Sequence, residues 1–167
     1  QYRHASFLLD AAGQQVFPDA ISLIERPHLK GAFGSAPFDN EGVATRDRDL
    51  VVRGVLDGYL LDAYSARKLG LATTGNAGGV HNLIVQGQML DPKSLLRKLG
   101  TGLLVTEMMG QGVNPVTGDY SRGAAGFWVE SGEVTRPVHE ITVAGNLRAM
   151  YRGIVAIGDD VDRRGTI

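Results

Sequence analysis

Short apolar runs separated by stretches rich in glycine, proline and asparagine dominate this chain. Such a pattern predicts strands joined by turns, since a long helix would show apolar residues at a spacing of three to four. We expect strands at 5–10, 21–25, 49–53, 55–62 and 83–87, a buried strand over 101–110, and a hairpin over 126–138 that turns at Ser131 and Gly132. The stretches 26–42 and 71–82 between them are predicted to be loops.

Three segments carry helix signals. One begins near Ala63 and is stopped by Gly70. Another has Asp91 as its N-terminal cap, Pro92 in its first position, Leu90 and Leu95 spaced as a hydrophobic staple, and Gly100 as its stop. In the last segment, Asn146 precedes an i, i+3, i+4, i+7, i+8 pattern of apolar residues, and Gly158 is its expected end. Because strands outnumber helices and arrive as hairpins, we predict an α+β fold with a mainly antiparallel sheet and a few short helices.

Composition narrows the class of protein. With 167 residues, 43% of them hydrophobic, the chain is long enough for one globular domain with a core. A net charge of -1 and scattered basic residues argue against direct nucleic-acid binding. The chain has no cysteine, and it has no apolar run of the roughly 18 to 20 residues that a membrane helix needs. We therefore expect a soluble, cytoplasmic protein without membrane association, and the start at Gln1 suggests a fragment of a longer chain.

Two motifs look like catalytic signatures but depart from them. The stretches TGNAGGV at 74–80 and YSARK at 64–68 resemble parts of a short-chain dehydrogenase, yet they occur in the opposite order to that family. The segment DYSRG lacks the first glycine of a G-x-S-x-G nucleophile elbow, and a strand is predicted after it where the elbow needs a helix. Ser121 is accordingly expected to be a turn serine.

The histidines and one glutamate are the candidates for a metal-binding or catalytic role. The four histidines lie apart in sequence, and neither His-x-x-x-His nor His-Glu-x-x-His occurs, so we expect no metal site in this segment. His81 lies in a glycine-rich loop, where it is either a hydrogen-bonded loop residue or a functional one. Glu107 follows an apolar run, so it either faces a cleft or pairs with an arginine.

Longer ordered stretches carry a more specific resemblance. YSARKLGLATTGNAGGVHN, GTGLLVTEMMGQGVNPVTGDYSRGAAGFWVESGEVTRPVHEITVAGNL and IVAIGDDV resemble the C-terminal part of the modulator-of-DNA-gyrase family, the PmbA (also called TldE) and TldD proteins. The resemblance runs from about Phe17 to Asp162 and implies a single C-terminal domain over 1–167, without the N-terminal domain. The segment GDYSRGAAGFWVE is similar to the PmbA branch of this family.

The resemblance implies different roles for two subunits. It implies a TldD/TldE heterodimer that acts as a zinc metallopeptidase on peptides or unfolded chains, with zinc held by an HExxxH helix of TldD. The PmbA-type subunit would support that partner without catalytic residues of its own in this segment, and this chain contains no HExxxH. A TldD-type catalytic subunit or a second copy of the chain is the expected partner, and no cofactor is expected in this segment.

The candidate cavity or interface residues are His81, Asn82, Glu107, Gln111, Asp119, Tyr120, Ser121, Arg122 and Trp128. We expect 118–130 to be a turn and strand entry that borders the cavity between subunits, with Phe127 and Trp128 on opposite faces of the strand. The alternative for this segment is a hairpin with an Arg–Asp pair and a core tryptophan. Two other functions remain open: a self-contained hydrolase that uses Glu107, His81 or Asp119, and an interaction module linked to control of DNA gyrase.

Overall fold

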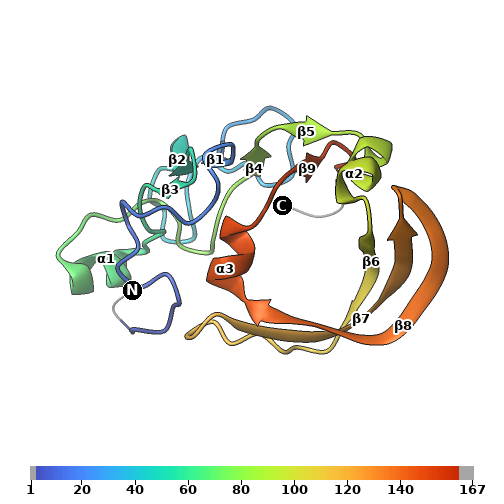
Figure 1. The fold of residues 1–167 in the computed structure, drawn as a ribbon. Helices are drawn as coiled ribbons and strands as arrows, with labels where there is room; N and C mark the ends of the chain where they lie inside the picture. The colour runs from blue at the N-terminus through green and yellow to red at the C-terminus, as the bar shows by residue number, and fades with distance from the viewer. Residues whose placement is uncertain (1–2, 162–167) are drawn as a thin grey trace. The chain divides into compact units, whose positions relative to one another are not determined.

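The chain folds into antiparallel sheets with short helices, as the sequence predicts. The structure is a computed structural model that describes residues 3–161 (Figure 1). These residues group into two compact units, 3–87 and 88–161. The predicted α+β class is confirmed, whereas the organisation of 1–167 as a single domain stays a prediction. Asp162, at the end of the resemblance, lies outside the described residues.

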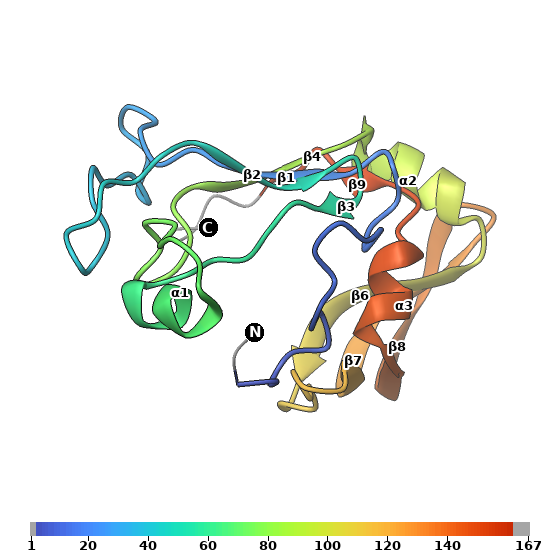
Figure 2. The ribbon, with the colours of Figure 1, turned by 90° about the vertical axis from the view of Figure 1, so that its left-hand side faces the viewer.

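The first unit is built on a four-stranded sheet in the order β3, β2, β1, β4 (Figure 2). Its strands are β1 (Ser22–Glu25), β2 (Arg48–Val52), β3 (Val55–Leu56) and β4 (Leu83–Gln86). Because β1 pairs on both sides, Leu23 lies between Val51 and Val85. The core beside this sheet consists of Ala11, Val16, Val51 and Leu56, with Leu8, Phe17, Leu23 and Tyr59 packed against it. Each buried branched side chain contributes about 1.5–3 kcal/mol to folding.

Two predicted strands of this unit are wrong. Residues 5–10 form turns, because the backbone N–H of Leu8 donates to the Ser6 hydroxyl and that of Leu9 to the Ser6 carbonyl. Such local side-chain bonds compete with strand pairing. The strand predicted over 55–62 ends at Leu56. Beyond it, the backbone of Leu61 bonds to the hydroxyl and backbone of Thr74, so residues 57–62 run as a connection to the next helix.

Helix α1 (Ala63–Leu69) follows the prediction at both ends. The Asp62 side chain accepts from the backbone N–H of Ser65, and Gly70 closes the helix in a left-handed conformation with φ of 67°. The helix is therefore set by local signals, and Ala66 is its buried contact with the rest of the unit.

The second unit contains a three-stranded antiparallel sheet in the order β6, β7, β8. Its strands bend together through a wide arc, and α3 continues from the end of β8 (Figure 1). The elements are β5 (Met89–Leu90), α2 (Pro92–Leu99), β6 (Gly102–Met109), β7 (Asp119–Glu130), β8 (Glu133–Asn146), α3 (Leu147–Arg152) and β9 (Ile157–Gly158). β5 and β9 pair in parallel.

The local predictions for α2 and the hairpin are confirmed. The Asp91 side chain accepts from the backbone N–H of Ser94, Pro92 occupies the first turn and Gly100 caps the end. At the hairpin tip, Ser131 and Gly132 have φ of 53° and 80°. Positive φ at both central residues is the signature of the turn that matches the twist of two antiparallel strands.

Three other predictions for this unit need correction. The strand over 101–110 is not buried, because none of the residues of β6 falls in the buried class. Helix α3 ends at Arg152, since the Gly153 backbone caps it, and Gly158 belongs to β9. The segment 118–130 is a strand from Asp119 onward, where the sequence predicts a turn and strand entry.

Candidate functional site

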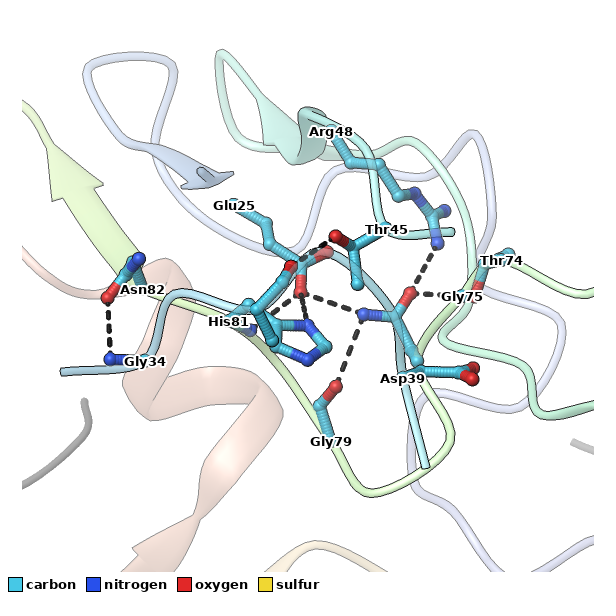
Figure 3. Close-up of polar contacts among 12 residues, drawn as sticks. Glu25, Gly34, Asp39, Thr45, Arg48, Thr74, Gly75, Gly79, His81 and Asn82 are labelled. Carbon is cyan, nitrogen blue, oxygen red and sulfur yellow. Dashed lines mark hydrogen bonds and ion pairs between the residues drawn. The ribbon is translucent and has the colours of Figure 1, made fainter. Parts of the chain in front are cut away.

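A buried carboxyl group lies at the centre of a polar cluster in the first unit. Glu25 ends the inner strand β1, and its side chain is only 1% exposed. Its Oε1 accepts hydrogen bonds from Nδ2 of Asn76 at 2.8 Å and from the backbone N–H of His81 at 2.7 Å, and it lies 3.2 Å from Nδ1 of His81 (Figure 3). One carboxyl oxygen thereby joins β1 to the glycine-rich loop 75–82.

The Asn76 side chain extends this cluster. Its Oδ1 accepts from the Thr74 hydroxyl at 2.7 Å and from Nη1 of Arg48 at 3.1 Å. Its Nδ2 donates to the Gly79 carbonyl at 3.2 Å as well as to Glu25. The buried amide thus has partners at both ends, which removes the free-energy cost of burying it unpaired.

Asp39 connects its own loop by hydrogen bonds to the glycine-rich loop 75–82. Its Oδ1 accepts from the backbone N–H groups of Glu41 and Val43, and its Oδ2 accepts from that of Ala77, each at 2.9 Å. Desolvation by burial raises the pKa of Asp39, but the three backbone hydrogen bonds outweigh it, so the pKa is lowered from 3.8. Glycine is favoured at position 78, where these loops meet, because its φ of 104° is a conformation that L side chains rarely adopt.

Asn82 has a structural role in the same loop system. Its Oδ1 accepts from the backbone N–H of Gly34, and its Nδ2 donates to the Arg26 carbonyl at 2.9 Å and to the Ser35 hydroxyl at 2.7 Å. The residue has φ of 47°, a left-handed conformation that asparagine tolerates better than most residues. The amide thereby holds loop 26–35 against the start of β4.

The Glu25–His81 pair orients an imidazole ring, an arrangement that also occurs in hydrolases and behind metal ligands. A catalytic zinc ion in a protein takes three protein ligands and an open position. Within residues 3–161, no three His, Cys, Asp or Glu side chains gather closely enough to hold a metal ion. The described residues therefore do not fit a zinc site, and the pair serves to anchor the loop 75–82.

A second polar site lies in the second unit, where a hollow of about 330 Å³ is lined by Gly110, Gln111, Val113 and Arg122. Nη2 of Arg122 donates to the Met108 carbonyl at 3.2 Å. Its Nε is buried and has no hydrogen-bond partner among the described residues. The hollow thus brings together Gln111 and Arg122, two of the predicted site residues, beside an unpaired donor.

Asp119 closes the turn that leads into β7. Its Oδ2 accepts from the Thr117 hydroxyl at 2.6 Å, and its Oδ1 accepts from Nδ2 of Asn146 at 3.3 Å. These two hydrogen bonds, the Thr117 one foremost, lower the pKa of Asp119. Tyr120 and Ser121 follow within β7, opposite Gly145 and Ala144. Ser121 therefore lies inside a strand, as part of a sheet ladder.

Glu107 and Trp128 lie elsewhere on the same sheet. Glu107 is exposed, next to an irregularity in the pairing of β6 with β7, and no ion pair involves it within 3–161. Trp128 is half-buried; its Nε1 donates to Oε1 of Glu130 at 3.0 Å, and the Arg136 guanidinium lies 5.8 Å from its ring centre.

The alternative of an Arg–Asp pair with a core tryptophan is wrong. Arg122 bonds to the Met108 carbonyl. Asp119 bonds to Thr117 and Asn146.

The predicted residues thus divide between the two units. His81 and Asn82 belong to the loops around Glu25, and the other seven lie in 88–161. Whether they face a cavity between subunits stays a prediction. Sequence reasoning missed Glu25, Asp39 and Asn76. The one available signal was Glu25 itself, an acidic residue at the end of the apolar run ISLIE. Its partners Asn76 and His81 lie 51 and 56 positions further along the chain, and no local pattern links them to it.

The sequence of this chain is similar to those of known proteins. The family model described as the PmbA/TldA metallopeptidase C-terminal domain matches residues 1–167. Metalloprotease PmbA of Escherichia coli O157:H7 is 55% identical over 166 residues, which cover 99% of this chain and 37% of that protein. A metalloprotease TldD homologue of Haemophilus influenzae is 24% identical over 171 residues, covering 94% of this chain and 35% of that protein. This chain therefore spans little more than a third of the length of such relatives.

A solved structure agrees with the fold. The crystal structure of a candidate modulator of DNA gyrase from Bacteroides thetaiotaomicron matches with a TM-score of 0.89 and 37% sequence identity. The match covers 95% of this chain and 36% of the other.

Proposed function

The chain belongs to the PmbA/TldA metallopeptidase family, whose C-terminal domain it carries, and from this membership we propose that it is part of a supporting subunit of a zinc metallopeptidase. The proposed partner is a TldD-type catalytic subunit, and a second copy of the same protein is the alternative partner. The proposed location is the cytoplasm. None of the described helices is long and apolar enough to cross a membrane.

The observation that carries this proposal is the open sheet of the second unit. Of the residues in β6, β7 and β8, only Ala124, Gly126 and Val129 are buried. Large apolar side chains stay exposed on these strands, among them Leu104, Met109, Phe127 and Val134. Leu104 and Phe127 are direct neighbours across β6 and β7, and exposed apolar surface on a folded protein commonly marks an interaction site. The sheet is therefore the proposed region of contact with the partner subunit.

Sequence similarity supports the PmbA-type assignment over the TldD type. The chain is 55% identical to a PmbA protein and 24% identical to a TldD homologue over nearly the same residues. In the heterodimer that we propose, the TldD-type subunit holds the zinc ion.

The proposed substrate is a peptide or an unfolded chain. In the sheet order β6, β7, β8, the first and last strands are edges. An edge strand can bind an extended peptide through main-chain hydrogen bonds, which do not depend on the peptide's sequence. This mode suits a peptidase that acts on many different chains.

A role in the control of DNA gyrase is a second candidate. It is favoured by the similarity to the Bacteroides thetaiotaomicron protein, which is described as a candidate modulator of that enzyme. A net charge of -1 gives the segment no electrostatic preference for DNA. The gyrase role is therefore proposed to act through proteins.

The test uses the full-length protein with and without its TldD-type partner. We expect peptidase activity and bound zinc only when the partner is present. Phe127→Asp should weaken the complex, because it places a charge on the exposed sheet, while the matched exposed change Phe33→Asp should leave assembly unchanged. Peptidase activity with bound zinc in this protein alone would show that it is catalytic and would overturn the proposal.

A further inference from the structure

We propose that the hollow beside Arg122 binds a carboxylate of a peptide, either its C-terminal carboxylate or an acidic side chain. The hollow is lined by Gly110, Gln111, Val113 and Arg122. The peptide as ligand rests on the proposed function, whereas the affinity of the hollow for a carboxylate rests on its own chemistry.

Arg122 is the charged residue of the hollow. Its side chain lines the hollow, and its buried Nε lacks a hydrogen-bond partner among the described residues. A buried N–H without an acceptor is rare in folded proteins. Because a guanidinium is a cation with several N–H donors, an anionic ligand in the hollow would balance its charge and accept hydrogen bonds from it.

No carboxylate of the described residues forms an ion pair with Arg122. Successive residues of a strand point to opposite faces, which places Asp119 and Arg122 on different faces of β7. Glu107 pairs with Ala125, again on the face opposite to Arg122. None of the ion pairs within residues 3–161 includes Arg122. The guanidinium charge is therefore available to a ligand.

The guanidinium of Arg122 is held in place without a ligand. Nη2 donates to the Met108 carbonyl on the neighbouring strand, and Arg122 itself lies opposite Val143 in the ladder with β8. A side chain fixed in this way loses less conformational freedom on binding, which favours affinity.

The wall of the hollow is held by backbone contacts. The backbone N–H of Ser121 donates to the Gly112 carbonyl at 2.7 Å, and Val113 pairs with Tyr120 in an antiparallel bridge, so the segment 110–113 is held beside β7. A Cβ at Gly112 would lie 1.6 Å from the Ser121 carbonyl oxygen, so only glycine permits this approach. Gln111 is carried on the same segment and adds an amide group to the lining.

The size of the hollow limits the ligand. A volume of about 330 Å³ lies at the lower end of the range for small-molecule sites, about 300–1,000 Å³. It accommodates the terminal residue of a peptide, while the rest of the chain lies outside. A single guanidinium with an adjacent amide suits a carboxylate, which carries one negative charge.

The experiment measures peptide binding to the full-length protein by fluorescence anisotropy, without reference to peptidase activity. The probe is a pentapeptide of alanine and serine with an N-terminal dye, prepared with a free or an amidated C-terminus, and as an amidated form with aspartate in the last position. We expect the free or the aspartate-bearing form to bind at least about tenfold more tightly than the neutral amidated form. The form that is preferred identifies the source of the carboxylate.

Variants assign the effect to the hollow. Arg122→Gln should abolish the difference between charged and neutral peptides, and Arg122→Lys should lose most of it, because lysine lacks the planar fork of donors. Arg136→Gln, which removes the same charge from the same sheet outside the hollow, should keep the difference. Melting temperatures of all variants confirm folding.

Three results would overturn the proposal: equal binding of charged and neutral peptides by the unchanged protein, no binding of any peptide, or an unaltered preference in a folded Arg122→Gln variant. These results are separate from the test of the proposed function. A protein that binds peptide carboxylates but is active without a partner would retain this site and lose its supporting role.

Discussion

Oε1 of Glu25 accepts the backbone N–H of His81 at 2.7 Å and lies 3.2 Å from Nδ1 of the same histidine, although the two residues are 56 positions apart. This contact closes the glycine-rich loop 75–82 onto the end of β1. A loop with many glycines has much conformational freedom to lose on folding, so it needs strong anchors. The buried carboxyl group is such an anchor.

Replacing Glu25 by glutamine should destabilise the protein. The amide keeps only one oxygen to accept the bonds from Asn76 and His81, and it places an NH₂ group in a buried site. We expect a loss of about 1–3 kcal/mol in the free energy of unfolding, measured with urea. Hydrogen exchange at the His81 amide should accelerate by more than it does elsewhere in the unit.

The matched control is Glu133→Gln, at an exposed position of β8. It should change the free energy of unfolding by less than about 0.5 kcal/mol. Equal stabilities for the two variants would show that the Glu25 contacts contribute nothing to folding.

Asn82 allows backbone strain to be separated from hydrogen bonding. Asn82→Ala and Asn82→Gly both remove the bonds to Gly34, Arg26 and Ser35. Only alanine adds the cost of a left-handed φ of 47°. We expect both variants to be less stable than the parent and the alanine variant to be about 1 kcal/mol less stable than the glycine variant. A glycine variant less stable than the alanine variant would contradict this account.

Gly112 should be intolerant of any side chain. Gly112→Ala would place a methyl group 1.6 Å from the Ser121 carbonyl oxygen, so segment 110–113 must move away from β7. We expect a loss of about 3 kcal/mol, measured by denaturant unfolding. Gly110→Ala, where a Cβ meets open space but φ is 75°, should cost about 1 kcal/mol. Similar losses for the two variants would show that the close approach is absent in solution.

The stability of the protein should fall in acid through Asp39. Its hydrogen bonds with the backbone of Ala77, Val43 and Glu41 favour the charged form, so its folded pKa lies below the unfolded value of 3.8. The unfolded state therefore binds the proton first, and the contribution of Asp39 to stability is complete above pH 3.8 and is lost as the pH falls through the folded pKa.

Urea unfolding between pH 7 and pH 2.5 tests this prediction. Asp39→Asn should be less stable at pH 7 and should show a shallower decline below pH 4 than the parent. Asp119, whose pKa is lowered mainly by the Thr117 hydroxyl, adds to the decline and remains in both proteins. Parallel curves for the parent and the variant would show that Asp39 does not titrate differently in the two states.

Much of the local structure follows from the sequence alone. The limits of α2 depend on Asp91, Pro92 and Gly100, and the hairpin tip depends on Ser131 and Gly132. Each of these signals acts within about four residues, through a capping hydrogen bond or a permitted φ value. The same local range explains why the antiparallel α+β class was predictable from hairpin patterns.

Elements that depend on distant partners were harder to predict. The apolar pattern that follows Asn146 continues past Arg152, yet the helix stops there, and Ile157 pairs with Met89 in a parallel ladder. Residues 57–62 look like a strand, but the backbone of Leu61 bonds to Thr74. In both cases, a tertiary partner overrides the local preference.

The candidate site shows the same division. Glycine-rich loops and the family resemblance drew attention to His81, Gln111 and Arg122 from the sequence alone. Only the tertiary structure decided that Asn76 and His81 meet at Glu25, and that the Gly112 carbonyl bonds to Ser121 next to Arg122. The sequence specifies turns and caps because their hydrogen bonds are made between neighbours. The burial of a carboxyl group and the isolation of a guanidinium depend on which distant segments fold against each other.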